Sequence, residues 1–274
     1  MKEFMLPYGK ETLKAEIEES HLAGVLLSEL HSYKAPKSGS ELVQEALEHP
    51  IGTPRLCDMA VGKKKIVVIS SDHTRPVPSH IIMPLLLAEI RKGNPDAEIT
   101  ILISTGLHRL TTKDELEAKF GSEITNKEHI VVHDCDDKDN LVYLGKLPSG
   151  GDLIINRLAA EADLLVAEGF IEPHFFAGFS GGRKSVLPGV ASRATVMYNH
   201  NSAFIADPHS RTGVIEGNPI HNDMLYAARA ARLDFIINVV IDAKHDPVFA
   251  VAGDCDLAHR AGREFLASKC QVDA

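Results

Sequence analysis

Residues 64–104 read KKIVVISSDHTRPVPSHIIMPLLLAEIRKGNPDAEITILIS and contain one complete strand–helix–strand pattern. The runs KKIVVISS (64–71) and AEITILIS (97–104) are short, apolar and rich in β-branched residues, which predicts two buried strands. Between them, residues 80–92 repeat apolar side chains at helical spacing, which predicts an amphipathic helix. Strands that run parallel need such a crossover helix, so this stretch indicates an α/β fold.

The same alternation continues through the rest of the chain. Further strands are expected at 129–133, 141–147, 153–155, 163–168, 235–241 and 248–251, and helices are expected to begin near 111–115 and to span 256–268. The pattern predicts a mostly parallel sheet with helices on both faces, a Rossmann-like architecture. The first 60 residues are more polar, and we expect a helical segment there. In such sheets ligands bind at the carboxyl ends of the strands.

Composition argues against several classes of protein. The chain has 274 residues and a net charge of −9, without a block of basic residues, so nucleic acid is not expected as a partner. Four cysteines (57, 135, 255 and 270) lie far apart and are expected to be reduced thiols. The sequence shows no signal peptide and no run of about 18 apolar residues. We therefore expect a cytoplasmic protein that does not associate with a membrane.

Two of the loops that follow predicted strands carry candidate ligand-binding residues. SSDHTRP (70–76) contains Asp72 and Arg75, and loops at strand ends are common places for ligand contacts. The alternative is that Asp72 or Thr74 caps a helix and Arg75 is a surface charge. STGLHR (104–109) places His108 after Gly106, and histidine is the leading acid–base group near neutral pH.

A third loop, residues 168–189, reads EGFIEPHFFAGFSGGRKSVLPG and is dense in glycine, aromatic residues and charge. It departs from the P-loop pattern because Arg183 stands between the glycine and Lys184. A Gly-rich turn that leads into a helix still offers backbone N–H groups to an anion. The residues expected to hold such an anion are Ser180, Gly181, Gly182, Arg183, Lys184 and Ser185.

The fourth candidate is His200, in MYNHN (197–201). Imidazole suits nickel, zinc and copper, but one histidine is not a metal site, and the other histidines lack H-x-x-x-H or H-E-x-x-H spacing. A zinc hydrolase is therefore disfavoured. The motifs G-x-S-x-G and G-x-G-x-x-G are also absent, which disfavours a serine hydrolase and a dinucleotide dehydrogenase.

Taken together, these segments resemble the amino-terminal part of the nickel-pincer lactate racemase family. The motifs that carry the resemblance, in chain order, are LPYGK (6–10), SSDHTRPVPSH (70–80), STGLHR (104–109), LPSGGD (147–152), EGFIEPHFFAGFSGGRKSVLPG (168–189), MYNHN (197–201) and FIINVV (235–240). They extend across essentially the whole chain. Long motifs in a fixed order are far more specific than any single histidine.

The resemblance implies a cofactor, a nickel-pincer nucleotide (pyridinium-3-thioamide-5-thiocarboxylic acid mononucleotide). It implies that Lys184 is joined to this cofactor through a thioamide and that His200 is the protein ligand to nickel. One histidine suffices because the cofactor brings the other three ligands, in the square-planar geometry that nickel favours. Cofactor-maturation proteins are implied as partners. Our own inference places the cofactor's phosphate on the 180–185 turn.

The resemblance also implies roles for the residues of the loops. His108 and His174 match an acid–base pair, one for each face of a lactate carbon, in a proton-coupled hydride transfer that inverts a 2-hydroxy acid. Arg75 is expected beside the substrate oxygen, where a fixed cation would stabilise developing charge. Asp72 is expected to accept a hydrogen bond from the cofactor's ribose.

The resemblance identifies residues 1–274 as one amino-terminal, cofactor-binding α/β domain. Members of the family continue into a second domain that clamps the substrate, and this sequence lacks it, so we expect the chain alone to be inactive. Two alternatives stay open. The enzyme could be a racemase or epimerase of another 2-hydroxy acid, or the chain could be a non-catalytic nucleotide- or phosphate-binding module.

Overall fold

The computed structural model describes residues 1–9 and 11–270, and its centre is a six-stranded sheet. The strands of this sheet are β3 (Lys65–Ser71), β4 (Glu98–Ser104), β5 (His129–Val132), β8 (Leu164–Phe170), β11 (Leu233–Ile241) and β12 (Pro247–Gly253). Their spatial order is β12-β11-β8-β3-β4-β5, and only β12 runs antiparallel to its neighbour. The predicted mostly parallel α/β sheet is confirmed.

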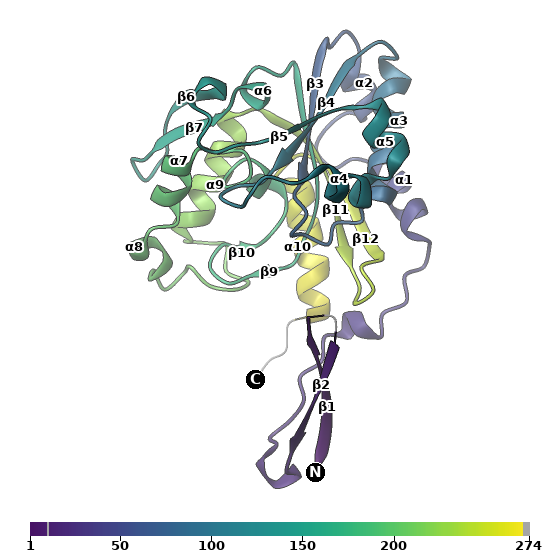
Figure 1. Cartoon of the computed structure of the whole chain (residues 1–274), viewed down its shortest axis with the longest axis vertical. Helices are drawn as coiled ribbons and strands as arrows, with labels where there is room; N and C mark the ends of the chain where they lie inside the picture. The colour runs from purple at the N-terminus through teal and green to yellow at the C-terminus, as the bar shows by residue number, and fades with distance from the viewer. Residues whose placement is uncertain (10, 271–274) are drawn as a thin grey trace.

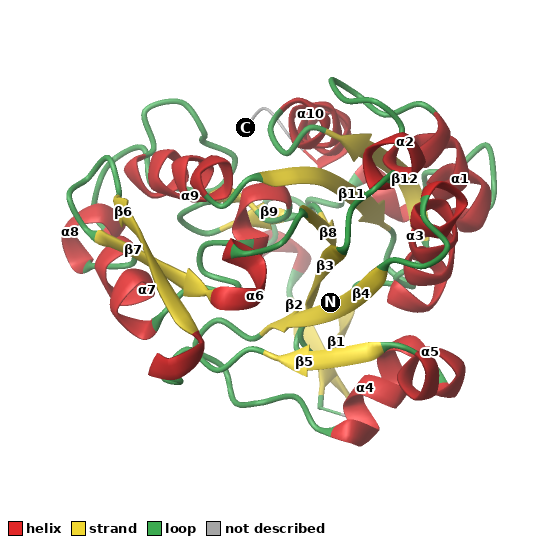
Figure 2. Cartoon of the chain, turned by 90° about the horizontal axis from the view of Figure 1, so that it is seen from above, coloured by secondary structure: helices red, strands yellow, loops and turns green. Residues whose placement is uncertain are grey.

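Helices cover both faces of the sheet, as predicted (Figure 2). They are α1 (Gly39–Glu48), α2 (Leu56–Ala60), α3 (Ser79–Gly93), α4 (Lys113–Phe120), α5 (Ser122–Lys127), α6 (Arg157–Ala160), α7 (Arg193–Asn199), α8 (Ser202–Ile205), α9 (Pro219–Ala230) and α10 (Leu257–Cys270). One apolar core packs α1–α5 on one face, and a second core packs α6, α7, α9 and α10 on the other. Strand β8 lies at the centre and is buried at every residue, as expected for a strand covered on both sides.

Sequence signals at the helix termini account for several boundaries. Thr112 caps α4, and its hydroxyl and the Glu115 carboxylate bond reciprocally to each other's backbone N–H groups. Ser38 and Glu41 form the same capping box at α1. Helix α3 begins only at Ser79, because Pro76 and Pro78 hold the preceding chain out of helical conformation.

Two smaller sheets stand beside the central one. Strands β6 (Leu141–Lys146) and β7 (Asp152–Asn156) pair antiparallel, close to α6 and α7 (Figure 2). Strands β9 (Pro173–His174) and β10 (Gly178–Phe179) form a two-residue pair within the third candidate loop. The segments predicted at 141–147 and 153–155 are therefore strands, but they belong to a separate sheet.

The first 60 residues differ from the prediction of a helical segment. They begin with an antiparallel hairpin of β1 (Lys2–Tyr8) and β2 (Glu11–Ile17) that extends away from the body of the molecule (Figure 1). Two 3-10 turns follow, η1 (Glu19–His21) and η2 (Glu29–His31), and only then do α1 and α2 pack on the sheet. Most hairpin residues are exposed, so hydrophobic periodicity carried little signal. Lys10 of the LPYGK motif, and residues 271–274, lie outside the described residues.

Among the described residues, we find no helix that is both long and apolar enough to cross a membrane.

The central core predicts a test of stability. Phe235 on β11 is fully buried, so Phe235→Ala should lower the free energy of unfolding by about 3–5 kcal/mol through lost burial and a residual cavity. Urea titration followed by circular dichroism measures this change. Tyr143→Ala, at a residue 55% exposed, is the matched control and should change stability little. A loss below about 1 kcal/mol for Phe235→Ala would contradict this packing.

Candidate functional site

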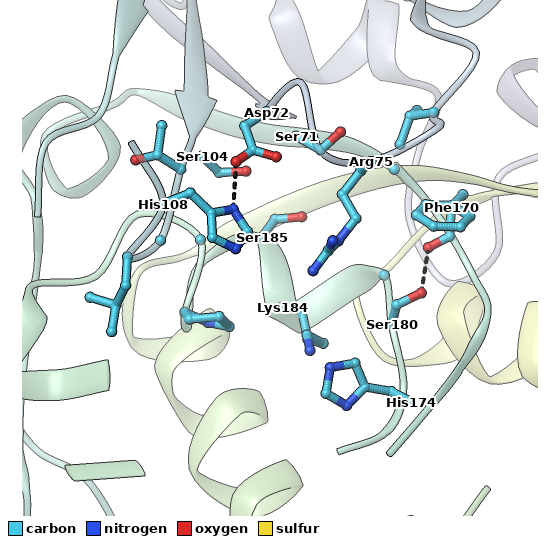
Figure 3. Close-up of a pocket in the computed structure, with 18 of the residues that line it drawn as sticks. Ser71, Asp72, Arg75, Ser104, His108, Phe170, His174, Ser180, Lys184 and Ser185 are labelled. Atoms are coloured by element: carbon cyan, nitrogen blue, oxygen red, sulfur yellow. Dashed lines mark hydrogen bonds and ion pairs between the residues drawn. The ribbon is translucent and has the colours of Figure 1, made fainter. Parts of the chain in front are cut away.

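A cavity of about 300 Å³ opens at the carboxyl ends of β3, β4 and β8 (Figure 3). The side chains predicted from the sequence that line it are Asp72, Arg75, His108, His174, Ser180, Lys184, Ser185 and His200, together with the backbone of Gly181. They come from all four candidate loops. Parallel pairing brings the first three loops together, because the strands' carboxyl ends lie at the same edge of the sheet, whereas His200 stands at the end of α7.

Asp72 is almost fully buried and connects the first two loops. One carboxylate oxygen, Oδ1, accepts hydrogen bonds from the backbone N–H and the hydroxyl of Thr74, at 3.0 and 2.6 Å. The other, Oδ2, lies 2.6 Å from Nδ1 of His108. Burial would raise the pKa of Asp72, but these hydrogen bonds outweigh it and hold the pKa below its usual value. The alternative of a helix cap at Asp72 or Thr74 is wrong, since α3 begins at Ser79.

His108 occupies the end of the turn that follows β4. Gly106 adopts a positive φ of 56°, and its N–H donates to the carbonyl of Gly189 at 3.0 Å, which joins this turn to the third loop. The His108 ring is partly exposed, with one nitrogen on Asp72 and the other directed into the pocket (Figure 3).

The third loop contributes His174 and Lys184 from opposite ends. His174 lies on β9, and its Nδ1 accepts the backbone N–H of Ala177 at 3.2 Å. Lys184 lies on a single 3-10 turn, η4 (Gly182–Ser185), and not on the helix expected after the glycines. The ring of Phe176 packs edge-on against His174 and against His200, at centroid distances of 4.7 and 5.1 Å.

Burial lowers the pKa values of Lys184, His174 and His200, three nitrogen groups that line this pocket. It lowers the pKa of Lys184 to about 7, with help from the positive charges of Arg183 and Arg75. Burial and the charge of Lys184 lower the pKa of His174 to about 3 and that of His200 to about 4. Groups with such shifted pKa values are typical of functional sites.

The glycines of the third loop are required by close packing. Gly181 has a φ of 78°, and a Cβ there would approach Asn238 Oδ1 to 2.8 Å and the Phe170 carbonyl to 2.9 Å. The N–H of Gly182 donates to Asn238 Oδ1 at 2.8 Å, and that of Ser180 donates to the Glu172 carbonyl. Because these donors are already bound within the protein, the turn offers fewer N–H groups to a phosphate than the sequence indicated.

Arg183 does not lie in the pocket, and its predicted role as a cation beside the cofactor is not supported by its position. The side chain is fully buried and is not among the residues that line the pocket. Its guanidinium donates to the carbonyls of Phe179 and Ala177, both at 2.7 Å, and Nε donates to Nδ1 of His221. Arg183 therefore fixes the loop that carries Lys184. Gly182 is likewise a packing residue.

Glu168 lines the pocket on β8 and was not predicted as a site residue, although it begins the 168–189 motif. The hydroxyls of Ser70 and Ser79 both donate to its Oε1, and among the described residues its buried Oε2 has no partner. Its place at the end of a predicted strand, inside a dense motif, was the available signal. Phe176 was missed in the same way.

The fold and the pocket define an α/β protein with a histidine- and lysine-lined ligand site at the carboxyl edge of its sheet. A family model described as the lactate racemase N-terminal domain matches residues 8–213. The chain belongs to this family. The resemblance inferred from the motifs is thus confirmed.

Curated relatives agree with this assignment. The chain is 56% identical over its whole length to a lactate racemase of Thermoanaerobacterium thermosaccharolyticum, and 53% identical over 98% of its length to one of Lactiplantibacillus plantarum. It spans 64% and 63% of the lengths of these two relatives.

Solved structures match as well. A lactate racemase apoprotein from T. thermosaccharolyticum superimposes with a TM-score of 0.92 at 55% identity, over 98% of this chain and 63% of that one. A Thermotoga maritima protein matches over 86% of this chain and 61% of that one, with a TM-score of 0.67 at 22% identity, and shares the fold.

The buried guanidinium predicts a loss of stability on substitution. Arg183→Met keeps an unbranched side chain but leaves the Phe179 and Ala177 carbonyls without their guanidinium donor. We expect the free energy of unfolding to fall by about 1–3 kcal/mol for each buried group left unsatisfied, measured by urea titration. Arg157→Met, at a side chain 45% exposed, is the control. Equal stability of the two variants would show that Arg183 does not hold the loop.

The lowered pKa of Lys184 predicts reactivity at neutral pH. Only the neutral amine reacts with a small acylating reagent, so its labelling should rise with pH and reach half its maximum near pH 7. Lys146 is the control, because its ion pair with Asp152 raises its pKa and delays labelling to higher pH. Peptide mass spectrometry over a pH series measures both. If labelling of Lys184 showed the same pH dependence as labelling of Lys146, the result would contradict the burial of the Lys184 amine.

Proposed function

We propose that the chain is the cofactor-binding part of an enzyme that interconverts D- and L-lactate. The observation that carries the proposal is the placement of His108 and His174 on separate loops around one pocket, beside Lys184. When inversion proceeds by hydride transfer, the hydroxyl proton must leave one enantiomer and return to the other, and two loops at one sheet edge supply a proton-transfer group for each. The two curated relatives described above carry the same activity in their names.

The pocket fits the nickel-pincer nucleotide. The buried Nδ1 of His200 has no hydrogen-bond partner among the described residues, and imidazole is a good ligand for nickel. Lys184, with a pKa of about 7, presents an amine that is neutral in a large fraction of molecules and so suits covalent attachment. In this proposal Lys184 holds the cofactor, His200 binds its nickel, and the cofactor, when bound, supplies the redox chemistry at the substrate's Cα.

The chain's own residues manage protons and orientation. His108 and His174 exchange the proton of the substrate hydroxyl. Arg75 lies at the rim of the same pocket and stabilises negative charge on the substrate oxygen. Apolar side chains, including Phe176 and Val196, exclude water from the inner wall.

The proposed enzyme depends on partner proteins, because separate maturation proteins would build and load the cofactor. The four cysteines are unpaired, as in proteins of the reducing cytoplasm, where we place this one. The phosphate-binding module is a weaker candidate, because N–H groups of the 180–185 turn are bonded internally.

Production together with cofactor-synthesis enzymes tests the proposal. We expect a mass increment on the Lys184 peptide, near-stoichiometric nickel, and conversion of L-lactate to D-lactate by full-length protein, followed by chiral chromatography. His174→Gln should retain nickel but lower racemisation by about 100- to 10,000-fold, the usual contribution of an acid–base group.

Two variants serve as controls for cofactor loading. Lys184→Arg should abolish the mass increment, whereas Lys146→Arg, on the exposed edge of β6, should not. An unmodified Lys184 without nickel, while a related racemase loads in parallel, would overturn the cofactor assignment. Full loading without turnover of lactate would redirect the search to other 2-hydroxy acids.

A further inference from the structure

The two candidate acid–base histidines are bonded to opposite kinds of partner. In each ring, Nδ1 is held by the protein and Nε2 is left for the pocket. Nδ1 of His108 lies 2.6 Å from a carboxylate oxygen of Asp72. Nδ1 of His174 lies 3.2 Å from a backbone nitrogen, the N–H of Ala177. A carboxylate can only accept a hydrogen bond, and a backbone N–H can only donate one.

A neutral imidazole carries one N–H and one lone pair, so its partner at Nδ1 decides what Nε2 presents. Asp72 requires a proton on Nδ1 of His108, which leaves a lone pair on Nε2. Ala177 requires a lone pair on Nδ1 of His174, which places the proton on Nε2.

We propose that this pocket fixes its two histidines in opposite tautomers, so that His108 presents a proton acceptor and His174 a hydrogen-bond donor to the substrate oxygen. Asp72 and the Ala177 N–H are then the positioning groups. The inference rests on the proposed racemase function and extends it, since the two histidines become unequal in the resting site.

Asp72 is held rigidly enough to impose this arrangement. Its Oδ1 is occupied by two donors from Thr74, the N–H and the hydroxyl, so the carboxylate cannot rotate without losing both. The side chain is 2% exposed. Hydrogen bonds keep its pKa low, and Asp72 therefore stays an acceptor at neutral pH.

His174 is held neutral by its surroundings, which agrees with a lone pair on Nδ1. The ring is largely buried, and the charged or titratable groups that act on it are cationic in their protonated forms: Lys184, Arg183, His200 and Arg75. Protonation of Nδ1 would point an N–H at the N–H of Ala177, so a charged His174 would have to break this hydrogen bond.

The arrangement defines the first proton transfer. The O–H bond of the substrate hydroxyl breaks, an N–H bond forms at Nε2 of His108, and the imidazolium is stabilised by the carboxylate of Asp72. His174 donates an N–H to the same oxygen, which offsets the negative charge that develops there. His174 can accept a proton at Nε2 only after the hydrogen bond from the Ala177 N–H to its Nδ1 is broken.

Nitrogen NMR of the histidine rings tests the tautomers directly and needs neither cofactor nor activity. In protein labelled with ¹³C and ¹⁵N at histidine, correlations from the ring protons identify which nitrogen is protonated. We expect Nδ1–H for His108 and Nε2–H for His174, with signals assigned from His108→Gln and His174→Gln. His133 is an internal reference for Nε2–H, because Nε2 faces the Ala191 carbonyl and Asn156 donates to Nδ1.

Asp72→Asn is the decisive variant. The amide oxygen should keep the position that accepts from Thr74, so the NH₂ group would face His108 and donate to Nδ1. His108 should therefore change to the Nε2–H tautomer while His174 stays unchanged. In loaded full-length enzyme, Asp72→Asn should lower kcat/KM about 1,000- to 10,000-fold, as loss of the correct tautomer does in serine proteases. Asp114→Asn, on the exposed surface of α4, is the matched control.

The outcomes separate this inference from the proposed function. Nδ1–H on His174, Nε2–H on His108, or an unchanged His108 tautomer in Asp72→Asn would each overturn the assignment, whatever the activity. Opposite tautomers in a protein that loads no cofactor would uphold the assignment and reject the racemase proposal. Equal losses of kcat/KM in both lactate directions are required by the equilibrium between enantiomers and serve as a check on the assay.

Discussion

The parallel pairing of β3 with β4 and β8 is the constraint on which the site depends. Since all three strands end at the same edge, residues that are distant in sequence, such as Asp72 and His108, 36 positions apart, meet around one cavity. Glu168 stabilises this edge, because its carboxylate accepts hydrogen bonds from hydroxyl groups at the end of β3 and the start of α3. Pairing places the loops, and short polar contacts then fix individual side chains.

The two neighbouring basic residues of η4 face different parts of the protein and have different roles. Arg183 points into the core and binds backbone carbonyls, while Lys184 points into the pocket. Burial disfavours the charged form of both side chains and lowers the pKa of Arg183 to about 9 and that of Lys184 to about 7. The structural cation is compensated by carbonyl dipoles, whereas the lysine is left as a reactive amine.

Much of this could be predicted from the sequence, because buried strands and a crossover helix have strong periodic signals. The strands 64–71 and 97–104 and the loops after them were identified correctly. The hairpin of β1 and β2 was not, since its residues are mostly exposed. Nor did the motif show which of Arg183 and Lys184 faces the pocket, or that Asp72 contacts His108. Both depend on three-dimensional packing between distant segments.

The close packing of Gly181 limits which substitutions this turn can accept. Any side chain there would collide with Asn238 of β11 and with the Phe170 carbonyl of β8. Asn238 is itself buried and receives the N–H of Gly182. Substitution at position 181, 182 or 238 would therefore require the whole turn to repack.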